Sequence, residues 1–419
     1  MDILKIATAG SVDDGKSTLI GRLLYETKSI TKDKLDALES ASKRKGLDFV
    51  DLSLLTDGLI AEREQGITID VAHIYFHSER RKYIIADTPG HVEYTRNMVT
   101  GASNAQVSVI LIDARHGLSE QTKRHFYIAS LLRIPYVVVA VNKMDLVKYD
   151  QAVFEKIKQD FQETCAKVGF EGQEVLFIPL SSLYGENVVE KSEKMGWYEG
   201  ASLLSIFERI PPQGDLFKDA PARLPIQYVI RPKTEQYHDY RGYAGRIVSG
   251  TLRVGDEVIA YPSGKSSTIA TIEKMEEQKE YATVGESVVV TLTDDIDISR
   301  GNMLVRKGEE INGKKEFQAN ICWLDEEPLR AGKTYLLQHG VNRQKSKLIS
   351  LNSAVDMPSL ETSIEPKEIR LNGIGLASLK VSQPIFADDY VVNPRNGSFI
   401  LIDEMSNNTV GVGFVSTSP

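Results

Sequence analysis

Apolar runs alternate with helix-like stretches along the first half of the chain. The runs are KIATA, KYIIAD, VSVILID, YVVVAVN and VLFIPL, and helix-like stretches follow the first four, near Gly15, His91, Glu120 and residue 150. Unbroken apolar runs of this kind are typical of strands buried on both faces, as in a parallel sheet covered by helices. The pattern predicts an α/β domain whose ligand lies at the carboxyl ends of its strands.

The pattern changes after PPQGDLFKDAP, residues 211–221, which we interpret as a linker because it is rich in proline and acidic residues. Beyond it, PIQYVIRP, YAGRIVSGTLRVGDEVIAYP and YATVGESVVVTL are short alternating strands separated by glycine turns. We therefore expect a mainly parallel α/β domain at 1–213, followed by two β-barrel domains at 221–310 and 314–419.

Composition narrows the classes of protein that fit. The chain has 419 residues and a net charge of −8, so it lacks the broad positive field of a general nucleic-acid binder, and no nucleic-acid partner is expected. Its two cysteines, Cys165 and Cys322, exclude a disulfide scaffold or a multi-cysteine metal site. We expect no signal peptide, because Asp2 and Lys5 lie in a short apolar start that has no small-residue cleavage pattern. We expect no membrane span, because Arg133 and Pro135 interrupt the longest apolar stretch, and we expect a cytoplasmic location.

The sequence GSVDDGKS, Gly10 to Ser17, follows a predicted strand and opens a helix, as a phosphate-binding loop requires. Its glycines let backbone N–H groups cradle a β-phosphate, Lys16 neutralises the β and γ oxygens, and the Ser17 hydroxyl ligates Mg²⁺. Asp13 and Asp14 would repel a triphosphate, so their side chains must point away or meet a cation. The predicted phosphate-binding set is Gly10, Ser11, Val12, Asp13, Asp14, Gly15, Lys16, Ser17, Thr18, Asp87 and Gly90.

The sequence NKMD, Asn142 to Asp145, ends the apolar strand YVVVAV. An aspartate there can accept from both the ring N–H and the amine of guanine, whereas adenine offers neither, so the site should select GTP over ATP. Ser181, Ser182 and Leu183 follow VLFIPL, where a loop would offer N–H groups to the guanine oxygen; the alternative is a plain turn at the end of a strand. The predicted guanine-binding set is Asn142, Lys143, Asp145, Ser181, Ser182 and Leu183.

Two further segments fit a hydrolytic switch. In DTPGH, Asp87 would hold Mg²⁺ through water, the Gly90 amide would sense the γ-phosphate, and His91 would orient or polarise the attacking water rather than act as a true general base. In EREQGITID, Thr68 would reach Mg²⁺ and the γ-phosphate only in the GTP state. We assign His91, Lys16 and Thr68 as catalytic, and Ser17, Thr68 and Asp87 as the magnesium site.

Several other motifs are interpreted as structural. YPSGKSS near Gly264 repeats Gly-Lys-Ser but has Ile259 where the first glycine is required, so we predict a turn. Asn396-Gly397 stands between VV and FILID and predicts a hairpin turn rather than a glycosylated Asn-Gly-Ser site. VAHIYFH alternates as a strand that exposes residues 73, 75 and 77, which disfavours a metal site at its two histidines. The basic triplets at 43–45 and 80–82 are predicted to be solvated turns.

The phosphate loop, Thr68, DTPGH, NKMD and the Ser181 turn occur in the order seen in translation-factor GTPases, which carry two barrels after the nucleotide domain. GRIVSGTLRVGDEV resembles the first of those barrels. Translational factors usually have histidine at the positions of Ser11 and Asp14. With that difference, and with LLTDGLIAEREQGITIDVAHIYF, GWYEGASLL and NGSFILIDEMSNNTVGVGF, the chain resembles the large, GTP-binding subunits of heterodimeric sulfate adenylyltransferases. Val92-Glu93 replaces the usual Glu-Gln after His91.

The resemblance implies a GTPase that works with a smaller catalytic subunit, using GTP hydrolysis to drive ATP and sulfate to adenylyl sulfate and pyrophosphate. The chain contains no Ser-Gly-Gly-X-Asp-Ser loop and no second complete phosphate loop, so the ATP and sulfate chemistry is expected on the partner. Two alternatives stay open at this point: an elongation-factor-like carrier of aminoacyl-tRNA, and a GTP-gated scaffold without coupling.

Overall fold

The computed structural model describes residues 2–44, 50–55, 71–88, 95–211, 217–232, 240–275 and 277–416. The chain divides into two compact units, Met1–Pro212 with Met357–Leu360, and Gln213–Asp356 with Glu361–Pro419. The first unit contains an α/β sheet and the second contains two barrels, in agreement with the predicted fold class. The predicted boundaries at 213, 221, 310 and 314 stay predictions.

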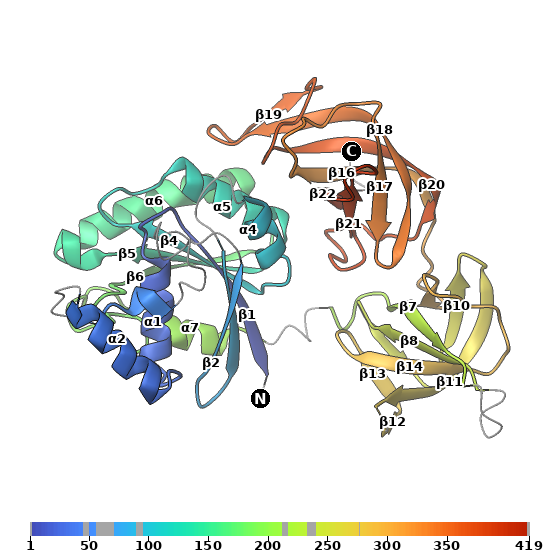
Figure 1. Cartoon of the computed structure of the whole chain (residues 1–419), viewed down its shortest axis with the longest axis horizontal. Coiled ribbons are helices and arrows are strands. Elements are labelled where there is room, and N and C mark those ends of the chain that lie inside the picture. The colour runs from blue at the N-terminus through green and yellow to red at the C-terminus, as the bar shows by residue number, and fades with distance from the viewer. Residues whose placement is uncertain are drawn as a thin grey trace. The chain divides into compact units, whose positions relative to one another are not determined.

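The first unit is built on a six-stranded sheet in the order β2-β3-β1-β4-β5-β6, in which only β2 runs antiparallel to its neighbour. Figure 1 shows α4, α5 and α6 along one face of the sheet and α1 and α7 along the other. The elements are β1 Ile3–Ala9, α1 Lys16–Glu26, α2 Lys32–Arg44, η1 Leu52–Leu55, β2 Ala72–His77, β3 Lys82–Asp87, α4 Thr95–Ala102, β4 Val107–Asp113, α5 Glu120–Leu131, β5 Tyr136–Asn142, η3 Met144–Val147, α6 Gln151–Val168, β6 Glu174–Pro179 and α7 Leu203–Arg209.

Burial follows from this layering. Every residue of β4 is buried, because helices cover both faces of the sheet at its centre. Leu19 and Leu23 of α1 and Phe207 of α7 join strand side chains in one core, while Phe126 of α5 packs edge-on against Phe161 of α6 with ring centroids 5.0 Å apart. This packing holds the strand ends, and the loops that follow them, in fixed relation.

Capping residues explain where the helices of this unit begin. The Ser119 hydroxyl accepts from Thr122 N at 3.0 Å to start α5, and the Asp150 carboxylate accepts from Ala152 N at 2.8 Å to start α6. Helix α1 differs, because its N-cap is Gly15 in a left-handed conformation, at φ +92°, which has no side chain to cap it. The N–H groups of the first turn of α1 are therefore available to an anion.

The second unit consists of two closed barrels. In the first, six strands in the order β10-β15-β7-β8-β14-β11 close through β10–β11, and in the second, β17-β21-β22-β16-β20-β18 close through β17–β18. The strands of the first barrel and of its surroundings are β7 Arg223–Ile230, β8 Gly242–Arg246, β9 Thr251–Arg253, β10 Glu257–Tyr261, β11 Lys265–Lys274, β12 Glu277–Lys279, β13 Tyr281–Thr283, β14 Ser287–Leu292 and β15 Met303–Arg306. Of these, β9 and β13 pair in a separate two-stranded sheet, and β12 extends the sheet beside β11. The second barrel comprises β16 Lys314–Trp323, β17 Thr334–His339, β18 Asn342–Asp356, β19 Glu361–Ile364, β20 Ile374–Ile385, β21 Ser398–Ile402 and β22 Thr409–Ser416.

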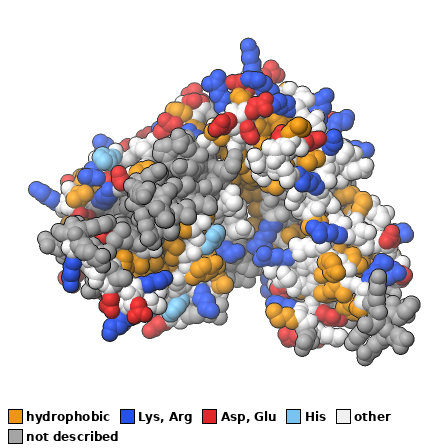
Figure 2. Space-filling model, viewed as in Figure 1, with side chains coloured by type: hydrophobic (Ala, Val, Ile, Leu, Met, Phe, Trp, Pro, Cys, Tyr) orange, Lys and Arg blue, Asp and Glu red, His pale blue; other side chains and the backbone are white. Residues whose placement is uncertain are grey.

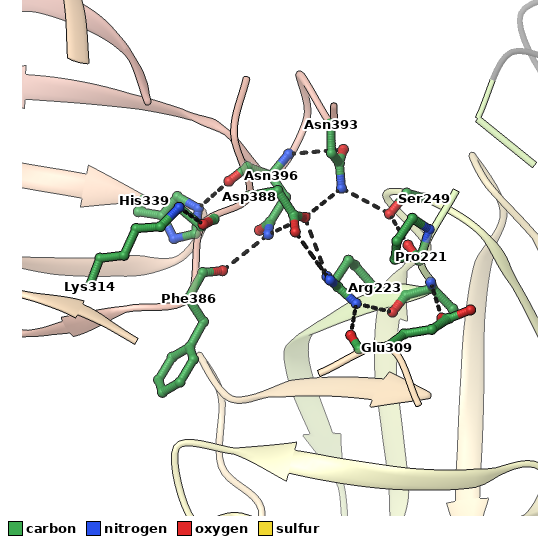
Figure 3. A network of polar contacts seen from close by, with 12 residues as sticks. Pro221, Arg223, Ser249, Glu309, Lys314, His339, Phe386, Asp388, Asn393 and Asn396 are labelled. Atoms are coloured by element: carbon green, nitrogen blue, oxygen red, sulfur yellow. Dashed lines mark hydrogen bonds and ion pairs between the residues drawn. The ribbon is translucent and has the colours of Figure 1, made fainter. Parts of the chain in front are cut away.

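A buried polar network joins the two barrels (Figure 3). The Arg223 guanidinium lies 3.1 Å from the Asp388 carboxylate, which also accepts from Asn393 Nδ2 at 2.9 Å and from Asn396 Nδ2 at 2.8 Å. Asn393 Nδ2 in turn donates to the Ser249 hydroxyl of the first barrel at 2.8 Å. Both barrels therefore contribute to one hydrogen-bonded cluster, in which the positive charge of Arg223 is paired with the negative charge of Asp388.

The same network shows that the hairpin prediction for Asn396-Gly397 was wrong. No strand precedes the pair directly, since β20 ends at Ile385, and β21 pairs with β17 and β22 instead. Asn396 is 2% exposed and donates to Phe386 O at 3.0 Å as well as to Asp388. Asparagine stands here because its amide satisfies buried acceptors, a requirement that a local turn pattern does not reveal.

The prediction of solvated turns for the basic triplets is confirmed only in part. Arg80 is exposed in the turn before β3, where Ser78 N donates to Arg81 O at 2.9 Å, and Lys82 is exposed at the start of β3. Arg81 is 5% exposed, and its guanidinium binds the Asp2 carboxylate and the carbonyls of Phe207 at 2.8 Å and Ile210 at 2.6 Å. It thus ties the start of β1 and the end of α7 to the turn before β3. Lys43 and Arg44 belong to α2 rather than to a turn, and Lys45 lies outside the described residues.

Two smaller predictions are confirmed. Gly264 lies in the turn between β10 and β11, which pair as a hairpin. In β2, residues 73, 75 and 77 are exposed as the alternation predicted. None of the described helices is both long enough and apolar enough to cross a membrane.

Candidate functional site

The predicted site residues follow the carboxyl ends of parallel strands. Loop 10–15 follows β1, Asp87 ends β3, Asn142 ends β5, and residues 181–183 follow β6. The strands are in register across this edge, with Thr8 opposite Asp87 and Asp113 opposite Asn142. Loops that are far apart in sequence therefore meet at one edge of the sheet.

Lys16, the first residue of α1, is 8% exposed and lies within its own loop. Its ammonium donates to Gly10 O at 3.2 Å and to Ser11 O at 3.5 Å, so the loop wraps around the side chain. Burial lowers the pKa of Lys16, and the nearby carboxylates of Asp87, Asp14 and Asp13 act in the opposite direction. A phosphate group placed here would add the negative charge that keeps the ammonium protonated.

The two aspartates of the loop behave differently. Asp14 is 8% exposed and turns back on its own loop, where its carboxylate accepts from Ser11 N at 2.6 Å. Burial raises the pKa of Asp14, while the Ser11 N–H bond and Lys16 oppose the rise. Asp13 is exposed, and its carbonyl oxygen accepts from the Lys143 ammonium. The Ser11 hydroxyl also has a partner, since it lies 3.1 Å from the Ser119 hydroxyl at the start of α5.

The end of β3 presents a buried carboxylate. Asp87 is 1% exposed, and its Oδ1 accepts from the Thr8 hydroxyl at 3.1 Å. The Thr88 hydroxyl donates to Thr8 O at 2.5 Å, which ties the two strand ends together. Ser17 and Thr18 lie in the first turn of α1 and are half-buried. Hydroxyl and carboxylate oxygens are the ligands that Mg²⁺ prefers, so the donor set near this edge fits that ion.

Asn142 connects the phosphate loop to the loop after β6. It is 1% exposed; its Nδ2 donates to Asp14 O at 2.7 Å, and its Oδ1 accepts from Ser182 N at 3.0 Å and from the Ser182 hydroxyl at 2.9 Å. A Cβ on Gly15 would stand 2.4 Å from Asn142 Nδ2, so this contact requires glycine. The Ser181 hydroxyl donates to Asp145 Oδ1 at 2.6 Å and orients that carboxylate.

Sequence reasoning missed Asp113 at the end of β4. Its carboxylate lies 2.9 Å from the Lys143 ammonium and 2.7 Å from Arg115 Nη2. Burial raises the pKa of Asp113, but hydrogen bonds from Arg115 and Lys143 outweigh it, so the pKa lies well below its ordinary range. Asp113 stays charged and fixes Lys143, and its place at the end of an apolar strand was the signal that would have revealed it.

Arg22 of α1 was also missed. Its guanidinium donates to Ser182 O at 3.1 Å and to Leu183 O. No motif marks this residue in the sequence. Three predicted residues, Thr68, Gly90 and His91, lie outside the described residues.

Two family models match parts of the chain. Residues 1–214 match the family model of the elongation factor Tu GTP binding domain, and residues 316–416 match that of the GTP-eEF1A C-terminal domain-like family. A solved structure of sup35 complexed with GMPPNP aligns with 99% of this chain and 94% of that chain, with a TM-score of 0.45 and 22% identity.

Curated relatives match over the full chain. The sulfate adenylyltransferase subunit 1 of Psychromonas ingrahamii is 47% identical over 100% of this chain and 87% of its own length, and that of Cellvibrio japonicus is 46% identical over 99% and 86%. The bifunctional enzyme CysN/CysC of Mycobacterium tuberculosis is 48% identical over 99% of this chain and 67% of its own length. The chain therefore belongs to the family of sulfate adenylyltransferase subunit 1, with an elongation factor Tu type of GTP-binding domain.

Proposed function

We propose that this chain is the GTP-hydrolysing subunit of a sulfate adenylyltransferase. In this role GTP hydrolysis drives the synthesis of adenylyl sulfate and pyrophosphate from ATP and sulfate on a smaller catalytic subunit. Membership of the family supports the activity. The proposal for this chain rests on the contacts of Asn142, which donates to Asp14 O at 2.7 Å and accepts from Ser182 N at 3.0 Å. These two bonds connect the phosphate loop, residues 10–15, to the loop after β6 that would read the base.

The phosphate half of the site is formed by loop 10–15 and the start of α1. The uncapped N–H groups of α1 would bind phosphate oxygens, with the positive end of the helix dipole behind them. Lys16 would stabilise the charge that develops on the β and γ oxygens during cleavage. Its burial at 8% exposure supports this role, because charges interact more strongly where water is excluded.

We assign the magnesium site to Ser17, Thr68 and, through water, Asp87. The buried carboxylate of Asp87, held by the Thr8 hydroxyl at 3.1 Å, supports the assignment. When bound, the ion would neutralise charge on the β and γ oxygens. The residues of the chain would position it, with the Asp87 carboxylate contacting the ion through a bound water.

The guanine half of the site is formed by residues 142–145 and 181–183. Asp145 would accept from the ring N–H and the 2-amine of guanine, and its bond from Ser181 at 2.6 Å supports that orientation. Adenine would leave this carboxylate without a donor, which is the physical basis of selection for GTP. Lys143, fixed by Asp113 at 2.9 Å, would lie with its alkyl stem against the base.

The switch would be formed by Thr68, Gly90 and His91. Thr68 and the Gly90 N–H would contact the γ-phosphate only in the GTP state, and loss of that phosphate would release both segments. His91 would orient or polarise the attacking water. Since adenylyl transfer from ATP to sulfate is unfavourable, GTP hydrolysis on this chain would supply the free energy for the reaction on the partner.

The alternative function is delivery of aminoacyl-tRNA. The net charge of −8 disfavours it, because binding of a polyanion requires a positive surface. Acidic and basic side chains are interspersed over much of the face drawn in Figure 2. The full-length match to sulfate adenylyltransferase subunit 1 also favours GTP hydrolysis coupled to adenylyl transfer over delivery of aminoacyl-tRNA.

The decisive experiment measures pyrophosphate release from ATP and sulfate, with the small catalytic subunit supplied. We expect GTP to raise the rate, a non-hydrolysable GTP analogue to fail, and Lys16→Ala to remove the stimulation. Lys156→Ala, at an exposed position on α6, is the matched control and should behave as the parent chain. Equal rates with GTP and the analogue would contradict coupling to hydrolysis.

A further inference from the structure

Arg22 of α1 binds the backbone of the base-reading loop, residues 181–183 after β6. It lies on α1, six residues after Lys16, and its side chain is 17% exposed. Its Nε donates to Ser182 O at 3.1 Å and its Nη2 donates to Leu183 O, so the planar guanidinium holds two successive carbonyls at once. A forked contact of this kind fixes direction as well as distance.

The direction of these carbonyls determines where the loop N–H groups point. In a trans peptide, the C=O and the following N–H point in opposite directions. With the carbonyls of Ser182 and Leu183 turned toward Arg22, the N–H groups of Leu183 and Tyr184 turn away from α1. Among the described residues, neither N–H has a hydrogen-bond acceptor. Two donors are thus left free on the side of the loop opposite α1.

Arg22 also closes a ring of contacts between the two halves of the site. From the phosphate loop, Asp14 O accepts from Asn142, Asn142 accepts from Ser182 N, and Ser182 O accepts from Arg22. Helix α1 then returns the ring to the phosphate loop at Lys16. Because a helix is stiff, the base loop cannot shift without straining either this ring or the start of α1.

The neighbours of Arg22 fix its side chain in this position. The Glu26 carboxylate lies 3.8 Å from Arg22 Nη1, and the Tyr25 ring centroid lies 5.7 Å from the guanidinium carbon. Glu26 also accepts from the backbone N–H of Val189, beyond the base loop. Gly185 leaves room for this contact, since a Cβ there would stand 2.1 Å from Glu26 Oε1. Arg22 is therefore held by its own helix and not only by the loop.

We propose that Arg22 is a positioning residue for guanine recognition, which sets the loop after β6 so that its free N–H groups read the 6-oxygen of the base. This inference rests on the proposed function, since it assumes that a guanine nucleotide occupies the site. It differs from a simple structural role in one respect. A merely stabilising arginine would change the folding of the unit, whereas a positioning arginine changes selectivity at one edge of the base.

The test uses the full chain and three nucleotides in calorimetric titrations: GDP, 6-thio-GDP and IDP. 6-Thio-GDP weakens only the acceptor at position 6, and IDP lacks only the 2-amine. We expect Arg22→Met to lower GDP affinity about tenfold and to narrow the preference for GDP over 6-thio-GDP by a similar factor. The preference for GDP over IDP, which depends on Asp145, should stay unchanged. Arg209→Met, at an exposed position on α7, is the control.

Arg22→Lys provides a second arm if Arg22→Met does not fold. Lysine keeps the charge beside Glu26 but cannot hold two carbonyls in a planar fork. The variant should therefore still have a smaller preference for GDP over 6-thio-GDP than the parent chain. The inference would be overturned if Arg22→Lys kept the parent chain's preference for GDP over 6-thio-GDP, or if Arg22→Met lost affinity equally for all three nucleotides. Absence of GDP binding in the parent chain would instead contradict the proposed function.

Discussion

Asn142 gives the sharpest prediction for the nucleotide site. Asn142→Ala removes three buried hydrogen bonds, those to Asp14 O at 2.7 Å, from Ser182 N at 3.0 Å and from the Ser182 hydroxyl at 2.9 Å. At about 1 kcal/mol each, the loss sums to about 3 kcal/mol, divided between folding and nucleotide binding. We expect GDP affinity to fall at least tenfold, and up to roughly 100-fold if the whole loss falls on the bound state.

The measurement combines GDP titration with denaturant unfolding. Trp197 lies in the first unit and Trp323 in the second, so tryptophan fluorescence reports on both. The matched control is Asn393→Ala in the second unit, where the residue is 2% exposed and donates to Ser249 at 2.8 Å and Asp388 at 2.9 Å. That variant should lose stability and keep its GDP affinity. The reasoning fails if Asn142→Ala binds GDP within about threefold of the parent chain.

Three further changes test other parts of the account. Asp145→Asn should shift preference from guanine toward xanthine nucleotides, because the amide can donate to the 2-oxygen of xanthine; unchanged selectivity in competition titrations would remove Asp145 as the base reader. Lys16→Ala should abolish GTP and GDP binding and leave the circular dichroism of the chain unchanged, and a variant that still binds would contradict the phosphate-loop assignment. Glu26→Gln tests a buried charge: burial raises the pKa of Glu26 to about 7 from its ordinary 4.5, with Arg22 opposing and Glu190 and Glu186 adding to the rise. The stability that Glu26 contributes is present below pH 4.5 and lost as pH rises through 7, so the glutamine variant should gain on the parent in free energy of unfolding between pH 5 and 8. Parallel stability curves would refute this.

Strand ends explain why much of the site was predictable. Asp87 and Asn142 close unbroken apolar runs, and in a parallel sheet the residues after such runs meet at one edge. Asp113 closes VSVILID in the same way and was overlooked because it belongs to no named motif. The position of Asp113 at the end of a buried parallel strand was therefore sufficient to predict it as a site residue, although no named motif includes it.

Arg22 was beyond the reach of local patterns. Its acceptors lie 160 and 161 positions further along the chain, and nothing in GRLLYE distinguishes it from a solvated helix residue. Only the tertiary approach of the loop after β6 to α1 creates the contact. Long-range contacts of this kind depend on the packing of the whole sheet, which sequence periodicity does not determine.

Two of the incorrect predictions, those for Arg81 and Asn396, have one physical cause. Arg81 and Asn396 stand in segments that look local and polar, a basic triplet and an Asn-Gly turn. Both are buried, at 5% and 2% exposure, because backbone carbonyls and carboxylates outside their own turns need donors there. Composition identifies polar residues, but it does not tell whether water or the protein satisfies them.

Calorimetric titration of the purified chain with GTP, GDP and ATP tests the central claim most directly. The account predicts that both guanine nucleotides bind at a single site and that ATP binds at least about 1,000-fold more weakly, because Asp145 would be left without a donor. Equal binding of ATP, or no heat with either guanine nucleotide, would contradict it.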